Sequence, residues 1–130
     1  MTYFEDVRAF HKRFKFPAPN SQEWLHAEVW AMRLRLILEE LAETAKAYAL
    51  FDPAGFADGL ADLVYVVLGS AVEAGIPFDE VWKEVQRANM AKVGGEKDRS
   101  GKLLKPDGWE PPDIDSILRK KMDNETAGET

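Results

Sequence analysis

The 130-residue sequence contains no cysteine and only two histidines. The absence of cysteine excludes a disulfide framework and any metal site built from thiolates, and it fits a reducing compartment. A metal site in this chain must therefore be built mainly from carboxylates, of which the sequence has 23.

The sequence also lacks an excess of positive charge, a signal-peptide pattern and a long apolar run. Its 17 basic and 23 acidic residues give a net charge of −6, which argues against a nucleic-acid surface. No apolar run reaches ~18 residues, the length that spans a bilayer. We therefore expect a cytoplasmic protein that has neither nucleic acid nor membrane as a partner.

Helical periodicity and capping signals predict an all-α fold, and no strand pattern of useful length is present. Thr2-x-x-Glu5 has the pattern of a capping box, and Asp52-Pro53 is typical of a helix start. The expected helices run from Tyr3 to about Phe14, from about Gln22 (capped by Asn20 or Ser21) to Leu50, from Asp52-Pro53 to near Ala74-Gly75, from Pro77 to Gly94-Gly95, and from Asp115 to Met122.

The length corresponds to one domain. We expect this domain over residues 1–122, with an irregular segment over 95–112 and a disordered tail over 123–130. The second helix has two apolar stripes and the third is apolar almost all round. Such helices are covered on more than one side, so we expect the bundle to be completed by homo-oligomerisation.

The most informative residues are five acids on the expected second and third helices. Glu39, Glu40 and Glu43 fall within roughly a 100° arc of one helical face. Asp58 and Asp62 lie one turn apart on the next helix. Five neighbouring acids repel one another unless a cation lies between them, and a hard divalent ion with oxygen ligands is the natural candidate.

Two ordinary explanations compete with a metal site. The glutamates could form surface ion pairs with Arg35 and Lys46. Asp62 lies among apolar neighbours, where an ionised carboxylate costs several kcal/mol unless it is paired or bound to metal. An arginine from another helix could supply that pairing.

Three motifs in order resemble the all-α nucleoside triphosphate pyrophosphohydrolases. They are Glu39-Glu40-x-x-Glu43, Asp58-Gly-Leu-Ala-Asp62-Leu-Val-Tyr65 and Asn89-Met-x-Lys92. This superfamily includes the MazG proteins, the dimeric dUTPases and phosphoribosyl-ATP pyrophosphohydrolase. The later segment GKLLKPDGWEPPDI is similar to the MazG-like and phosphoribosyl-ATP pyrophosphohydrolase-like branch.

The resemblance implies a MazG-like bundle of four to five helices, in a homodimer or a dimer of dimers. It implies Mg²⁺-dependent hydrolysis of a (deoxy)nucleoside triphosphate to the monophosphate and pyrophosphate, in the service of cleansing the nucleotide pool. The base and sugar stay open, and phosphoribosyl-ATP is among the candidates. Mg²⁺, with Mn²⁺ as an alternative ion, would activate a water and neutralise phosphate charge.

The same resemblance assigns roles to individual residues. The metal ligands would be Glu39, Glu40, Glu43, Asp58 and Asp62. Glu40 and Glu43 would be catalytic, with Glu40 orienting or deprotonating the water. The family's second motif, Glu-x-x-Asp, places a glutamate where Gly59 stands, so Asp58 carries over only as its substitute.

Substrate contacts are expected downstream. Asn89 and Lys92 share a helical face, and Lys102 and Lys105 lie in the irregular segment, which could close over bound substrate as a lid. The residues to be tested as substrate ligands are Asn89, Lys92, Lys102 and Lys105. In the competing interpretation, Asn89 and Lys92 only end a helix and complement its dipole, and the two later lysines lie in a solvated loop.

Two other classes of protein compete with this reading. A di-iron carboxylate bundle needs two Glu-x-x-His motifs, and Glu23-x-x-His26 supplies one, whereas Arg8 stands three residues before His11. A non-catalytic helical dimerisation or adaptor module would carry the acids only as a solvated face.

Overall fold

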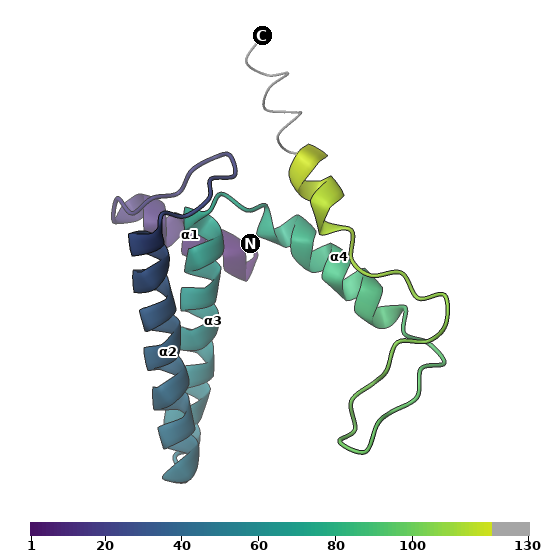
Figure 1. The fold of residues 1–130 in the computed structure, drawn as a ribbon. Coiled ribbons are helices and arrows are strands. Elements are labelled where there is room, and N and C mark those ends of the chain that lie inside the picture. The colour runs from purple at the N-terminus through teal and green to yellow at the C-terminus, as the bar shows by residue number, and fades with distance from the viewer. Residues whose placement is uncertain (121–130) are drawn as a thin grey trace. The chain divides into compact units, whose positions relative to one another are not determined.

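The computed structural model describes residues 1–120, and within them it contains helices but no strand. The helices are α1 (Tyr3–Arg13), α2 (Ala27–Ala49), α3 (Pro53–Glu73) and α4 (Phe78–Met90), followed by a fifth helical segment over 114–120 (Figure 1). The predicted all-α fold of four to five helices is confirmed. The predicted helix end at Met122 and the tail over 123–130 lie outside the described residues.

The chain divides into two compact units, Met1–Phe78 and Asp79–Thr130. The first unit contains α1, α2 and α3. The second contains α4 beyond its first residue, an irregular segment and the helical segment over 114–120. One domain over 1–122 stays a prediction.

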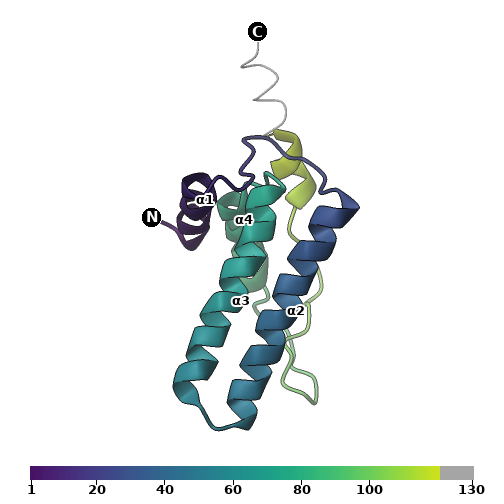
Figure 2. The same ribbon diagram turned by 90° about the vertical axis from the view of Figure 1, so that its left-hand side faces the viewer.

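Within the first unit, α2 and α3 lie side by side and antiparallel, and α1 packs against α3 (Figures 1 and 2). The turn between α2 and α3 is short because Phe51 adopts a left-handed conformation with φ of 54°. Asp52 then caps α3 by accepting a hydrogen bond of 2.9 Å from the N–H of Gly55. The predicted start at Asp52-Pro53 is confirmed.

The core of this unit forms where α1 crosses the end of α3. Its buried apolar side chains come from both helices, and Ala18, Ile76 and Phe78 pack around them. The predicted capping box of α1 is present, since Thr2 and Glu5 exchange two hydrogen bonds of 3.1 Å. The buried core consists of Phe4, Val7, Leu68, Ala71 and Val72.

The predicted start of α2 is wrong: the helix begins at Ala27 rather than near Gln22. Neither predicted cap is used, because the guanidinium of Arg8 donates a hydrogen bond of 2.7 Å to the side-chain oxygen of Asn20. The N–H of Glu23 donates to the carbonyl of Ala74 at 2.9 Å. These tertiary contacts hold the segment before α2 in an irregular conformation.

By length and composition, α3 is a helix that could cross a membrane, with a mean hydropathy of 1.5 in a window that is 28% buried. Core helices of soluble proteins share these properties, and α3 packs against both α1 and α2. The chain nevertheless leaves much of its apolar surface uncovered, as Val64 at 49% exposure illustrates. Within one chain α3 is therefore covered only in part, and its cover by a second copy stays a prediction.

In the second unit, hydrogen bonds hold residues 109–110 of the segment after α4 against that helix. The indole N–H of Trp109 donates to the carbonyl of Ala88 at 2.6 Å. Arg87 pairs with Glu84 at 2.8 Å and also donates to the carbonyl of Glu110. The helical segment over 114–120 is capped by Asp113, which accepts from the N–H of Ser116 at 3.2 Å, and not by Asp115 as predicted.

Candidate active site

Two close approaches set the register between α2 and α3. Gly59 packs against the side chain and backbone of Thr44, and Gly69 packs against the guanidinium of Arg33. Because the helices are antiparallel, residues midway between these contacts face each other. This register puts Glu40 level with Asp62.

The carboxyl group of Glu40 is the most perturbed acid of this region. Its side chain is partly buried, and its Oε2 atom is buried without a hydrogen-bond partner. Burial raises the pKa of Glu40, and the neighbouring negative charges raise it further. In decreasing order of effect these charges belong to Glu43, Asp62, Asp58 and Glu39.

All four other predicted ligands thus lie within electrostatic range of Glu40. We call the five residues the carboxylate cluster. Glu43 and Asp58 are exposed, and Asp62 is partly buried. Glu39 is exposed and its Oε1 lies 3.7 Å from Nε of Arg35, which is the predicted surface pair. The cluster comprises Glu39, Glu40, Glu43, Asp58 and Asp62.

The cluster is an open acidic face and not a closed cage. Within residues 1–120, no group of three or more Asp, Glu, His or Cys side chains is arranged to hold a metal ion. The ion pairs recorded for Arg33 and Arg35 go to Glu73 and Glu39, and none in the described residues reaches Asp62. The cluster therefore carries negative charge that the described chain does not neutralise.

Gly59 explains why the family's glutamate is missing. A Cβ atom at this position would clash with Oγ1 of Thr44 and lie 3.1 Å from its Cα atom. A glutamate could be accommodated only if α2 and α3 moved apart. Asp58, one residue earlier, is exposed and raises the pKa of Glu40; its role as the substitute for that glutamate stays a prediction.

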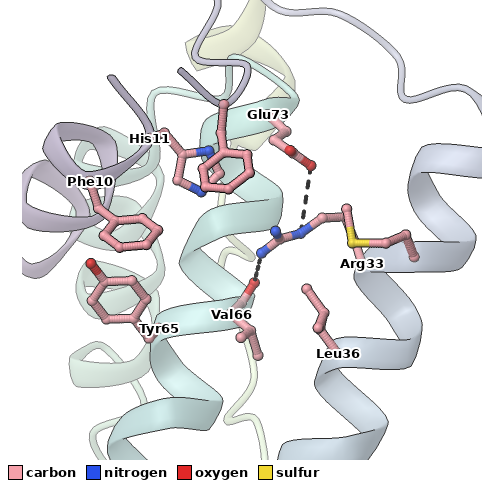
Figure 3. Close-up of a pocket in the computed structure, with 9 residues that line it drawn as sticks. Phe10, His11, Arg33, Leu36, Tyr65, Val66 and Glu73 are labelled. Carbon is pink, nitrogen blue, oxygen red and sulfur yellow. Dashed lines mark hydrogen bonds and ion pairs between the residues drawn. The ribbon is translucent and has the colours of Figure 1, made fainter. Parts of the chain in front are cut away.

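A second polar group, which the sequence did not reveal, lies farther along the same two helices. The guanidinium of Arg33 extends from α2 to α3, where Nη2 donates to the carbonyl of Val66 at 2.6 Å and Nε donates to Oγ of Ser70 at 3.2 Å (Figure 3). Nε also lies 3.6 Å from Oε2 of Glu73, and the two side chains are only 7% and 5% exposed. Burial lowers the pKa of Arg33, while Glu73 opposes this effect.

His11 completes this group from α1. The ring is buried, and its Nδ1 atom lies 3.0 Å from the carbonyl oxygen of Pro17. A carbonyl can only accept, so Nδ1 donates to it, and in the tautomer that carries its proton on Nδ1 the Nε2 atom is an acceptor. We call Arg33, Glu73 and His11 the Arg33 cluster.

The Arg33 cluster borders a cavity of about 410 Å³ between α1, α2 and α3 (Figure 3). Most of the wall is aromatic or aliphatic. Two features of the sequence could have indicated this cluster. Arg33 stands next to an apolar stripe of α2, and Glu73 is a charged residue in the apolar helix α3. The lining residues are Phe10, His11, Phe16, Met32, Arg33, Leu36, Tyr65, Val66 and Glu73.

The predicted substrate ligands belong to the second unit. Asn89 lies exposed in the last turn of α4. The ammonium groups of Lys92 and Lys105 lie 5.3 and 5.2 Å from the centre of the Trp109 ring. The N–H of Lys102 donates to Oδ1 of Asp98 at 3.0 Å, within a hairpin-like turn. Lys92 and Lys105 thus both contact the ring of Trp109.

A family profile described as phosphoribosyl-ATP pyrophosphohydrolase matches residues 7–89. The match includes the carboxylate cluster, the Arg33 cluster and Asn89, and it ends before Lys92, Lys102 and Lys105. A comparison with curated proteins gives no match. Because the profile covers more than half of the chain, the chain belongs to the phosphoribosyl-ATP pyrophosphohydrolase family, within the all-α nucleoside triphosphate pyrophosphohydrolase superfamily.

Proposed function

We propose that the protein is a Mg²⁺-dependent nucleoside triphosphate pyrophosphohydrolase that releases a nucleoside monophosphate and pyrophosphate. The observation that carries the proposal is the carboxyl group of Glu40, whose Oε2 is buried without a hydrogen-bond partner and whose pKa is raised first by burial and then by four other acids. A buried, unpaired oxygen beside excess negative charge is a position that a cation would stabilise. Membership of a pyrophosphohydrolase family supports the same reaction class.

The residues present fit a hard divalent ion, since all five members of the carboxylate cluster offer oxygen ligands. When bound, Mg²⁺ or Mn²⁺ would neutralise phosphate charge and lower the pKa of a water. Glu40 and Glu43 are the proposed catalytic residues. A raised pKa makes the Glu40 carboxylate a stronger acceptor for a proton from water, so Glu40 is the proposed base. All five acids, Glu40 included, are the proposed ligands of the ion.

Substrate binding is assigned to the second unit. We propose that Asn89 binds the sugar or base, and that Lys92, Lys102 and Lys105 bind phosphate oxygens as point charges. The irregular segment over 95–112 would act as the lid that excludes water. The ammonium groups near Trp109 support this assignment, because one ring holds two cations close together. The expected cellular role is nucleotide-pool cleansing in the cytoplasm.

We propose further that the protein is a homodimer or a dimer of dimers. Support comes from apolar side chains that α2 and α3 leave exposed, such as Leu38 at 54% and Leu60 at 45%. An exposed apolar face of this kind marks a protein–protein contact. Leu38→Glu should lower the mass measured by light scattering, whereas Lys46→Glu, an exposed change on the same helix, should leave it unchanged.

The test of the proposed reaction is pyrophosphate release from a panel of nucleoside triphosphates and phosphoribosyl-ATP, with chelator and with added Mg²⁺. Glu40→Gln and Asp62→Asn should each lower kcat/KM for the best substrate by at least about 10²-fold, because a general base alone contributes this much. Glu28→Gln is the matched control, since Glu28 is exposed in the first turn of α2. Full activity of the Glu40 variant would refute the assignment.

The competing function, a non-catalytic dimerisation module, draws support from the Arg35–Glu39 pair, which belongs to an ordinary solvated face. The two functions separate without any substrate. A metal that binds the native state raises the melting temperature, whereas a solvated face responds to Mg²⁺ no more than to an equal ionic strength of Na⁺.

A further inference from the structure

The cavity beside the Arg33 cluster lies one helical turn from the carboxylate cluster on both helices. Leu36, in its wall, precedes Glu40 by four residues, and Val66 follows Asp62 by four. Four residues of α-helix correspond to roughly 6 Å. A nucleotide whose phosphates bind at the acids therefore reaches the cavity with its nucleoside end.

We infer that this cavity binds the nucleobase of the substrate, through the aromatic wall and the polar edge formed by Arg33 and Glu73. The inference rests on the proposed function, because it treats the cavity and the carboxylate cluster as parts of one site. Of the two groups proposed for Asn89, it leaves the sugar. The cavity volume of about 410 Å³ lies within the range of small-molecule sites, which are mostly apolar with a few directed polar groups.

The aromatic wall suits a flat ring. Phe10 contacts Tyr65 edge to face, with ring centres 5.6 Å apart, and lies nearly parallel to Phe16 at 6.1 Å. Figure 3 shows Phe10 and Tyr65 adjacent on the α1 side of the cavity, with Arg33 opposite. Aromatic side chains of this kind stabilise a base by contact with its π face.

The polar edge selects for a neutral ring that has both donors and acceptors. Oε2 of Glu73 is buried and has no hydrogen-bond partner. The recorded hydrogen bonds of Arg33 use Nε and Nη2, and Nε2 of His11 is an acceptor. A nucleobase edge places an N–H beside a carbonyl or ring nitrogen, which pairs with a carboxylate and a guanidinium together.

The same polar edge argues against other occupants. An aliphatic molecule would leave Oε2 of Glu73 with its ion pair to Arg33 but without a hydrogen bond, and a buried acceptor without a hydrogen bond is costly. A phosphate or carboxylate would meet the negative charge of Glu73 beside Arg33. Gly69 lets both polar side chains approach α3, because a Cβ atom there would collide with the guanidinium of Arg33 and lie 3.2 Å from Nε2 of His11.

The test uses nucleosides alone, in chelator and without phosphate, so that binding is read without catalysis. Saturation-transfer NMR of the full chain with adenosine, guanosine, cytidine, uridine and thymidine should show saturation of base protons for at least one of them. Ribose 5-phosphate and inorganic pyrophosphate are the base-free probes. The protons of ribose 5-phosphate should not become saturated, and neither probe should displace the bound nucleoside.

The variants are Phe10→Ala and Tyr65→Ala, with Tyr3→Ala as the control. Tyr3 lies on the same helix as Phe10, is 78% exposed and does not line the cavity. Phe10 is itself 40% exposed, so its removal should leave the fold intact by circular dichroism. Each cavity variant should weaken nucleoside binding about tenfold, which corresponds to the stacking contribution of one aromatic ring. The control should not.

Glu73→Gln probes the polar edge separately. This change keeps the shape and replaces one acceptor oxygen by a donor, so it should change the order of preference among the five nucleosides more than it weakens the best one. An unchanged order would overturn the role of Glu73 in recognition.

The outcomes separate this inference from the proposed function. Nucleoside binding that depends on Phe10 and Tyr65, in a protein without pyrophosphohydrolase activity, would support the cavity and refute the reaction. Hydrolysis of nucleoside triphosphates with unchanged KM and base preference in both cavity variants would support the reaction and overturn the inference. Hydrolysis of base-free tripolyphosphate as fast as that of the best nucleoside triphosphate would also overturn the inference about the cavity.

Discussion

The paired helices α2 and α3 carry two groups of polar side chains, and these groups handle charge in opposite ways. The Arg33 cluster is buried and internally paired, since the guanidinium of Arg33 meets Glu73 and two oxygen atoms of α3. The carboxylate cluster carries charge of one sign, and its effect appears in the raised pKa of Glu40. The first group completes the fold, whereas the second is the proposed site of a cation.

The comparison also shows how one pair of helices serves both structure and function. Hydrogen bonds from Arg33 fix α2 against α3 at one level, and the Thr44–Gly59 contact fixes them at another. Four of the five carboxylates lie between these two contacts, and Asp58 lies next to the second one, beside Gly59. Repulsion among the acids is therefore resisted by the packing on both sides, and it does not separate the helices.

The largest expected effect comes from breaking the paired group. Arg33→Met leaves the buried carboxylate of Glu73 without its counter-ion, and it should lower the free energy of unfolding by about 3–5 kcal/mol. Urea denaturation followed by circular dichroism measures this loss. The double variant Arg33→Met/Glu73→Leu removes both charges and should lose less. If the double variant were less stable than Arg33→Met alone, the cost of burying Glu73 would not be offset by Arg33.

The next effect sharpens the comparison by adding the missing charge. Mg²⁺ at a hundred times its Kd should stabilise the protein by about 2.7 kcal/mol. Glu40→Gln should abolish most of this stabilisation. Thermal melting in chelator and in Mg²⁺ measures it. The matched variant Glu28→Gln should respond like the unmodified protein, because Glu28 lies outside the carboxylate cluster. An equal gain in the Glu40 variant would contradict the proposed metal site.

The pH dependence without metal has a definite sign. The folded pKa of Glu40 is raised, so between its unfolded and folded values the native state binds more protons than the unfolded state does. Stability then falls as the pH rises through this interval. Glu40→Gln should flatten that part of the profile and make the metal-free protein more stable above it. Added Mg²⁺ should reverse the slope, because the ion binds the deprotonated acid.

The two halves of the carboxylate cluster could be predicted from the sequence because each depends only on spacing within one helix. Glu40 and Glu43 share a face by their separation, and Asp62 stands out in an apolar helix. The Arg33 cluster could not be predicted, because pairing Arg33 with Glu73 requires the register between α2 and α3. That register is set by the packing of Gly59 and Gly69, which spacing does not reveal.

The helix boundaries show the same difference between local contacts, which the sequence predicts, and tertiary contacts, which it does not. The starts of α1 and α3 were predicted because Thr2 and Asp52 act within their own turns. The start of α2 was not, since Arg8 engages the Asn20 side chain from another helix. Local capping is thus readable from sequence, and tertiary competition for a capping residue is not.

A smaller effect tests whether packing confines the carboxylates. Gly59→Ala introduces a Cβ atom that clashes with Thr44, and such overpacking should cost about 1–3 kcal/mol. The helices must then shift near Glu40, so the gain from Mg²⁺ should also fall. Ala61→Ser, on an exposed position of the same helix, is the control and should cost less than about 0.7 kcal/mol. A Gly59 variant with unchanged stability and Mg²⁺ response would show that this contact does not set the register.

The smallest effect concerns the turn that joins the two helices. Phe51 is 92% exposed and has a φ of 54°, a conformation that costs a non-glycine residue roughly 1–2 kcal/mol. Phe51→Gly removes this strain and loses little packing, but glycine adds unfolded-state entropy of roughly 0.5–1 kcal/mol. The net result should be a gain of up to about 1 kcal/mol in urea denaturation. Leu50→Gly is the matched control, because Leu50 has a φ of −92° and gains nothing from glycine.

The Mg²⁺ response should be the same in both variants, since the turn lies beyond the Thr44–Gly59 contact. A change in that response would mean that the turn, and not the packing of Gly59, positions the carboxylates.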